Sequence, residues 1–120
     1  HHARFMARTR EAAGWTSQFR EIVLRINARL HDLRGPEYGD VLDRDDYSPG
    51  QTLSDRLHKA SSDGVVYPSV RCAEGECVGL FYPDLVSHPL QARHLDYHWD
   101  GTSVNLYRVA GTGEVFRVVE

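Results

Sequence analysis

The stretch Ser62-Asp-Gly-Val-Val-Tyr-Pro-Ser-Val-Arg71, with Glu76-Cys-Val-Gly-Leu-Phe-Tyr-Pro83 shortly after it, decides the fold of this 120-residue chain. The Asp-Gly pair is typical of a turn, and the β-branched and aromatic run that follows it predicts a strand. Pro68 ends this strand because proline cannot donate a hydrogen bond to the ladder of a sheet. Residues 77–82 supply a second apolar run of strand length. The sequence therefore predicts two neighbouring strands joined by a polar loop, with Val65, Val66, Val78, Leu80 and Phe81 among the most buried residues.

Polar side chains that could contact a ligand follow the first of these strands. Side chains alternate along an extended chain, so Ser69 and Arg71 are predicted to project to the same side. A hydroxyl beside a guanidinium suits a ligand that carries phosphate or ribose. A serine hydroxyl at this place can also simply cap the end of the strand, and both interpretations of Ser69 stay open.

Composition limits the class of protein. A length of 120 residues corresponds to one domain with a single core. Charged residues make up 26% and hydrophobic residues 41%, and no apolar run approaches the roughly 18 residues of a membrane helix, so a soluble protein is expected. The net charge of −3 and the scattered arginines argue against direct binding of nucleic acid. Two cysteines, with no disulfide framework and no secretory signal, favour the cytoplasm.

The first half of the chain mixes helix, strand and loop signals. Residues 2–12 contain good helix formers, and Gly14 is placed to stop that helix. Residues 19–33 fit both a strand and a helical face, and their β-branched content favours a strand. Residues 32–46 are rich in glycine, proline and aspartate and predict a loop.

The second half of the chain is predicted to be mostly strand. A helix is predicted to precede these strands: Ser48 is its N-cap, Pro49 is at the first helical position, and it ends near Ala60. Leu53 and Leu57 are predicted to form its buried face. The further predicted strands are residues 85–98, 103–109 and 115–119. Tight turns join most of these strands. The fold class is therefore predicted as α+β, with a mostly antiparallel central sheet and a few flanking helices.

A zinc site is one alternative for the polar residues. Cys72, Cys77, His94 and His98 offer thiolate and imidazole, which zinc prefers. The two histidines lie in a predicted strand, however, where positions four apart are separated by about 13 Å, too far to bind one ion together. We therefore predict no metal, and assign the cysteines to a small buried side chain at Cys77 and a partly exposed one at Cys72.

A hydrolytic triad is a second alternative. The residue types that it needs are present as Ser69, His94, His98, Asp96 and Asp100. The Gly-x-Ser-x-Gly nucleophile elbow is absent, because Pro68 and Val70 flank the serine. A serine hydrolase is thus supported by residue types alone.

Six segments of the chain together resemble the C-terminal part of the RES domain. They are Leu30-His-Asp-Leu-Arg-Gly35, Leu42-Asp-x-x-x-Tyr47, Ser48-Pro-Gly-Gln51, Asp63-Gly-Val-Val-Tyr-Pro-Ser-Val-Arg71, Cys77-Val-x-Leu-Phe-x-Pro83 and Arg93-His-Leu-x-Tyr-His-Trp-Asp-Gly101. The resemblance covers nearly the whole chain. It implies a fold related to ADP-ribosyltransferases and a toxin of a bacterial RES-Xre type II toxin-antitoxin system.

The resemblance also implies a substrate and partners. Proteins of this family consume NAD by phosphorolysis or hydrolysis of the nicotinamide-ribose bond, or by transfer of ADP-ribose to a protein. The implied partner is an Xre-type helix-turn-helix antitoxin, and a homodimer is compatible with the family. NAD would be the substrate, and no metal is implied. The sequence does not distinguish phosphate, water and protein as acceptors of ADP-ribose.

Of the arginine, glutamate and serine that give the family its name, only the serine has a match, at Ser69. The resemblance places the arginine and the glutamate before residue 1, so we expect residues 1–120 to be a single RES-like domain without its N-terminal portion. His1-His2 is interpreted as native sequence, with a residual affinity tag as the alternative.

The resemblance makes Ser69 the candidate catalytic residue, acting by binding and positioning, with Tyr67 and Arg71 as weaker candidates for the wall of the NAD pocket. We expect the 120-residue chain alone to be inactive on NAD. The alternatives are a catalytically inactive RES-like module that binds a protein, and the serine hydrolase.

Overall fold

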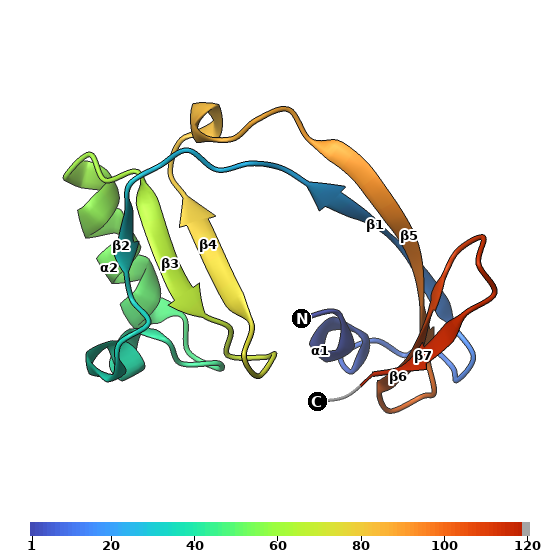
Figure 1. The fold of residues 1–120 in the computed structure, drawn as a ribbon. Coiled ribbons are helices and arrows are strands. Elements are labelled where there is room, and N and C mark those ends of the chain that lie inside the picture. Colours follow the sequence, from blue (N-terminus) through green and yellow to red (C-terminus); the bar gives the residue numbers. More distant parts are fainter. Residues whose placement is uncertain (119–120) are drawn as a thin grey trace. The chain divides into compact units, whose positions relative to one another are not determined.

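The computed structural model describes residues 1–118, which form two compact units (Figure 1). One unit comprises residues 25–87, and the other comprises residues 1–24 together with the chain from residue 88 onward. Helices are few and most strand pairs are antiparallel, so the predicted α+β class is confirmed. The likeness to ADP-ribosyltransferases and the single domain over residues 1–120 stay predictions.

The unit of residues 25–87 is built on a three-stranded sheet. Its elements are β2 (Leu30–Asp32), the 3-10 helix η1 (Pro36–Val41), α2 (Ser48–Lys59), β3 (Gly64–Pro68), β4 (Glu76–Leu80) and the 3-10 helix η2 (Pro83–Leu85). The sheet order is β2-β3-β4, with β2 parallel and β4 antiparallel to β3. Parallel neighbours need a long crossover connection, which η1 and α2 provide here.

The strands β3 and β4 confirm the two-strand prediction. Pro68 is the last residue of β3, as expected for a residue without a backbone N–H. The two strands approach so closely at Gly64 that a Cβ there would collide with the carbonyl oxygen of Gly79. Glycine at position 64 is therefore required by packing, in addition to its place in the Asp-Gly turn signal.

Burial in this unit is shallower than the sequence predicts. Val65 is 5% exposed and belongs to the core, as does Leu33 at 7%. The predicted burial of Val78 is wrong, because its side chain is 40% exposed. Along an antiparallel pair, Val78 lies opposite Val66 rather than Val65, on the other face of the sheet. Residues 66, 80 and 81 are half-buried.

The helix α2 confirms the Ser48-Pro49 signal with a shift of one position. Ser48 is the first helical residue and Tyr47 occupies the N-cap position. The hydrogen bond expected from a capping side chain comes instead from Asp46, whose Oδ1 accepts from the Ser48 N–H at 3.0 Å. Leu53 and Leu57, which were predicted to be buried, are half-buried. The predicted loop before α2 contains η1, two turns of 3-10 helix that begin at its proline.

The other unit contains a four-stranded antiparallel sheet. Its elements are α1 (His2–Met6), β1 (Thr16–Val23), β5 (Leu90–Trp99), β6 (Val104–Val109) and β7 (Val115–Arg117), in the sheet order β1-β5-β6-β7. An aromatic row crosses all four strands: Phe19, Tyr97, Tyr107 and Phe116 follow one another at centroid distances of 5.0, 6.2 and 5.0 Å. Trp99 is the most buried aromatic residue of this unit, at 3% exposed.

Three predicted boundaries in this unit are wrong. The first helix ends at Met6 rather than near residue 12, because the hydroxyl of Thr9 donates to the Met6 carbonyl and closes the last turn. The strand expected from residue 85 begins at Leu90, after η2. The last strand ends at Arg117, and residue 119 lies outside the described residues.

The segment 19–33 fitted both a strand and a helix. The strands β1 and β2 confirm the strand interpretation for the parts of this segment that they cover. No helix within residues 1–118 is long and apolar enough to cross a membrane.

Candidate functional site around the Ser69 turn

The predicted serine lies at the start of a tight turn between β3 and β4, residues 69–75, which we call the Ser69 turn. The backbone N–H of Ser69 donates to the Gly75 carbonyl at 2.7 Å and closes the turn. Inside it, the Gly75 N–H donates to the Cys72 carbonyl at 3.0 Å. Glu74 takes a left-handed backbone conformation with φ of 62°, which is uncommon for a residue with a Cβ. The turn is therefore defined by its own hydrogen bonds.

The Ser69 hydroxyl caps this turn. Its Oγ accepts hydrogen bonds from the backbone N–H groups of Arg71 at 3.2 Å and Cys72 at 3.1 Å. A hydroxyl has two acceptor lone pairs and one donor proton, so both lone pairs are used here and the O–H remains as a donor. The group can thus donate a hydrogen bond to a ligand oxygen from a fixed position.

The extended chain on which the predicted direction of Arg71 depends is absent, because the chain bends at residues 70 and 71. The guanidinium points at the segment before α2, where Nη2 donates to the Tyr47 hydroxyl at 3.1 Å and to the Arg44 carbonyl. Its Nε is buried and has no hydrogen-bond partner within residues 1–118.

Tyr67 lies two residues before Ser69, opposite Cys77 on β4. Its ring packs above Gly79, where a Cβ would come within 4.0 Å of the ring. Burial, and secondarily the neighbouring Cys77, raise the pKa of the Tyr67 hydroxyl above its usual range. This hydroxyl therefore stays protonated at neutral pH and serves as a neutral hydrogen-bonding group.

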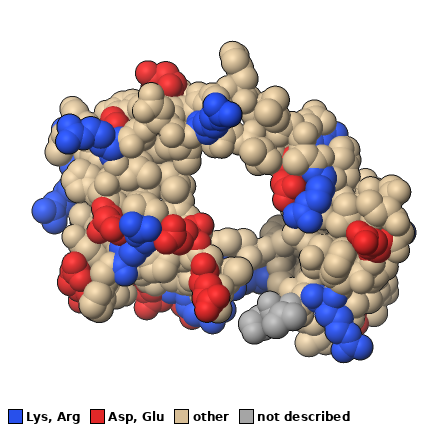
Figure 2. Space-filling view, viewed as in Figure 1, with Lys and Arg blue, Asp and Glu red and all other residues tan. Residues whose placement is uncertain are grey.

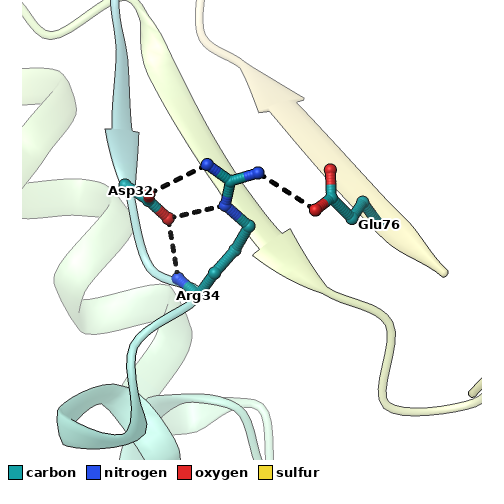
Figure 3. Close-up of polar contacts among 3 residues, drawn as sticks. All are labelled: Asp32, Arg34 and Glu76. Carbon is teal, nitrogen blue, oxygen red and sulfur yellow. Dashed lines mark hydrogen bonds and ion pairs between the residues drawn. The ribbon is translucent and has the colours of Figure 1, made fainter. Parts of the chain in front are cut away.

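A cluster that the sequence analysis missed lies at the same end of the sheet (Figure 3). The Arg34 guanidinium reaches across the sheet: its Nε and Nη2 donate to the two oxygens of Asp32 at 2.9 Å each, and its Nη1 donates to Glu76 at 3.0 Å. Glu76 pairs with Pro68 in the ladder and so lies next to the Ser69 turn. The Asp32–Arg34 spacing of two residues was visible in the sequence, but the contact to Glu76 spans 42 residues.

The charges of this cluster are largely satisfied within it. Hydrogen bonds from Arg34 lower the pKa of the Asp32 carboxyl to about 2, and the same contacts raise the pKa of the Arg34 guanidinium. Two carboxylates and one guanidinium leave a local charge of −1. Asp32 and Glu76 therefore clamp β2 to β4 through Arg34, and each of the two carboxylates is paired with the guanidinium.

Three of the residues considered for a hydrolytic triad, Asp96, His98 and Asp100, have partners of their own. Asp96 accepts from Arg108 at 2.7 Å, and His98 Nδ1 lies 2.7 Å from the Asn105 side-chain oxygen. Backbone N–H groups of residues 102 and 103 bond the Asp100 carboxylate and lower its pKa. Within residues 1–118 no hydrogen bond joins a histidine to Ser69, and no group of three or more His, Cys, Asp or Glu residues could hold a metal ion.

Basic and acidic side chains are interspersed on the face of the molecule shown in Figure 2. Within residues 1–118, ion pairs join several charged side chains, among them Arg34 with Glu76 and Arg93 with Glu21. Part of the charge of the described residues is therefore compensated locally.

The family model of the RES domain matches residues 1–100. The chain belongs to the RES domain family, as its central Asp63–Arg71 motif and His98-Trp-Asp-Gly101 segment indicate. This family is associated with toxin-antitoxin systems. Neither the curated proteins nor the solved structures contain a match to the chain.

Proposed function

We propose that the chain contributes Ser69 to the NAD-binding site of a toxin from a bacterial RES-Xre pair. The observation that carries this proposal is the geometry of Ser69. Two backbone N–H groups fix its oxygen, and its O–H remains available to a ligand acceptor. A ribose hydroxyl or a phosphate oxygen of NAD is an acceptor of this kind. Tyr67, whose hydroxyl stays protonated, stands two residues away as a second candidate for the pocket wall.

The proposed reaction is cleavage of the nicotinamide-ribose bond. This reaction passes through an oxocarbenium-like state, in which positive charge develops on the ribose and a carboxylate stabilises it. A serine hydroxyl orients the ribose or a phosphate, and it supplies no negative charge. We therefore assign Ser69 a binding and positioning role, with phosphate, water or a protein as the acceptor of ADP-ribose.

The carboxylates beside the Ser69 turn are poorly suited to the electrostatic role. Arg34 already pairs with both Asp32 and Glu76, and all three side chains are about half exposed to solvent. We expect the isolated 120-residue chain to release no nicotinamide from NAD, measured by chromatography with and without phosphate. Robust release would mean that one of these carboxylates serves the reaction after all.

The proposal also names the partner, the location and the oligomeric state of the protein. An Xre-type helix-turn-helix antitoxin would bind the toxin and block the NAD cleft, and the pair would act in the bacterial cytoplasm. The toxin would use no metal and would make no direct contact with nucleic acid. A homodimer is a further part of the proposal.

One observation favours a second function, a catalytically inactive RES-like module that binds a protein. Ser69 and Arg71 both make hydrogen bonds that stabilise the fold itself. NAD turnover by the protein as its gene encodes it separates the two functions, because the inactive module leaves NAD intact. The serine hydrolase is tested in the same preparation with a fluorophosphonate probe, which would label Ser69 only if the serine were an activated nucleophile.

A further inference from the structure

We propose that Arg71 and Tyr47 are positioning residues for Ser69, and that Arg71 does not hold the diphosphate of the substrate. The inference rests on the proposed NAD site. Arg71 links two segments that are distant in the sequence, because its guanidinium binds the Tyr47 hydroxyl and the Arg44 carbonyl in front of α2. Its own backbone N–H binds the Ser69 hydroxyl. One residue thus connects the candidate site to the start of a helix.

Three of the five N–H donors of the Arg71 guanidinium are unavailable to a ligand. Nη2 has two N–H bonds, and it donates to two acceptors, the Tyr47 hydroxyl and the Arg44 carbonyl. Nε is buried and so cannot reach a ligand at the surface. An arginine that binds phosphate does so best with two parallel N–H groups, one from each of two nitrogens. Only Nη1 remains for such a contact, so the bidentate geometry is not available to Arg71.

The segment that accepts the Arg71 hydrogen bonds, residues 43–47, is held by hydrogen bonds of its own. Asp43 Oδ1 accepts from the N–H groups of Asp45 at 2.7 Å and Asp46 at 2.9 Å. The Tyr47 carbonyl accepts from the Gln51 N–H at 2.9 Å, which places Tyr47 at the start of α2. The helix α2 in turn packs on β3. Arg71 therefore closes a loop of contacts that runs from β3 through the Ser69 turn and α2 back to β3.

This closed loop explains why the anchor matters for Ser69. Cys72, Ala73 and Glu74 in the turn are exposed to solvent, so packing holds the turn weakly. Without the Arg71 anchor, the Arg71 N–H would be held beside the Ser69 oxygen only by the hydrogen bonds of the turn itself. A displacement of about 1 Å at a positioning group can cost on the order of a hundredfold in rate. Tyr47 is 47% exposed, and removing its hydroxyl should leave the fold intact.

The first test needs no activity. Amide hydrogen exchange at Arg71 and Cys72 is measured in the 120-residue chain and in Tyr47→Phe, with Tyr38→Phe as the matched control. Loss of one hydrogen bond should speed exchange at these two amides about fivefold and leave the amides of β3 unchanged. Unchanged exchange at Arg71 and Cys72 in Tyr47→Phe would overturn the positioning role whatever the protein does to NAD.

The second test uses NAD turnover by the protein as its gene encodes it. Tyr47→Phe, Arg71→Lys and the double variant are compared, with Arg56→Lys as the control. For positioning residues we expect kcat to fall about tenfold with the KM for NAD little changed. The double variant should have the same kcat as the less active of the two single variants, because both substitutions remove the same contact. A rise in KM confined to the Arg71 variant, or independent additive losses, would instead assign Arg71 to the diphosphate and overturn the proposal.

A third variant, Tyr47→Leu, separates the hydroxyl from the ring. If Tyr47→Phe behaves as the parent and Tyr47→Leu alone is impaired, the ring is the functional part and the anchor is refuted. If Ser69→Ala leaves turnover unchanged while exchange responds to Tyr47→Phe, the anchor stands and the proposed NAD site fails. The two claims therefore fail separately.

Discussion

The two units of the chain are stabilised in different ways. The four-stranded sheet is an antiparallel arrangement with an aromatic row across it and one deeply buried tryptophan. The three-stranded sheet includes a parallel pair and is connected by polar contacts, chiefly Arg34 with its two carboxylates and Arg71 with the segment before α2. Packing is non-directional, whereas hydrogen bonds fix the positions of individual atoms. The four-stranded sheet also has ion pairs, such as Arg93 with Glu21, but the contacts of Arg34 and Arg71 lie beside the Ser69 turn, which makes the three-stranded unit the better platform for a site.

The largest expected effect is in the aromatic unit. Trp99 is 3% exposed, and its indole N–H donates to the Glu11 carbonyl at 3.3 Å. Trp99→Ala should lower the free energy of unfolding by about 3–5 kcal/mol, because it leaves a large cavity. The measurement is chemical denaturation. The control is Trp15→Ala at a tryptophan that is 49% exposed, and equal losses at both positions would contradict the account of this unit.

A smaller effect is expected where α2 packs on β3. Leu57 is half-buried, so Leu57→Ala should cost about 1–2 kcal/mol, below the range for a fully buried leucine. Leu90→Ala, at a side chain that is 68% exposed, is the control and should change stability by less than about 0.5 kcal/mol. A loss at Leu57 as large as that for Trp99→Ala would show that the three-stranded unit depends on packing as much as the other unit does.

The smallest effect is electrostatic and appears at low pH. The pKa of Asp32 is lowered from 3.8 to about 2 by hydrogen bonds from Arg34, so the ionised carboxylate stabilises the fold above pH 3.8. This stabilisation is lost as the pH falls from 3.8 towards 2. Thermal unfolding between pH 5 and 2 should therefore be less pH-dependent in Asp32→Asn than in the parent or in the control Asp40→Asn. Equal pH dependence in all three would mean that the Arg34 clamp is not formed in solution.

Sequence reasoning succeeded where the signal is local. Asp63-Gly64 and Pro68 bound β3, and Ser48-Pro49 marks the start of α2 to within one residue. It failed where a distant residue decides: the burial of Val78 depends on which face of the sheet is covered, and the contact of Arg34 with Glu76 joins residues 42 positions apart.

The candidate site shows the same division. Ser69 was identified from its motif, and its cap on the turn was one of the two interpretations that the sequence left open. The prediction for Arg71 assumed an extended chain, and the period of two does not apply where the chain bends at residues 70 and 71. The loop between the two strands was predicted, but the left-handed conformation of Glu74 within it was not.

Whether Ser69 lines the NAD site is decided by NAD turnover of the protein as its gene encodes it, compared with Ser69→Ala, Ser69→Thr and the control Ser54→Ala. We expect Ser69→Ala to lose at least about tenfold in kcat/KM, corresponding to about 1.4 kcal/mol of transition-state stabilisation. Ser69→Thr, which keeps a hydroxyl for the cap and the ligand, should retain more activity, and Ser54→Ala should match the parent. Turnover by folded Ser69→Ala equal to that of the parent would contradict the claim that this serine lines the NAD site.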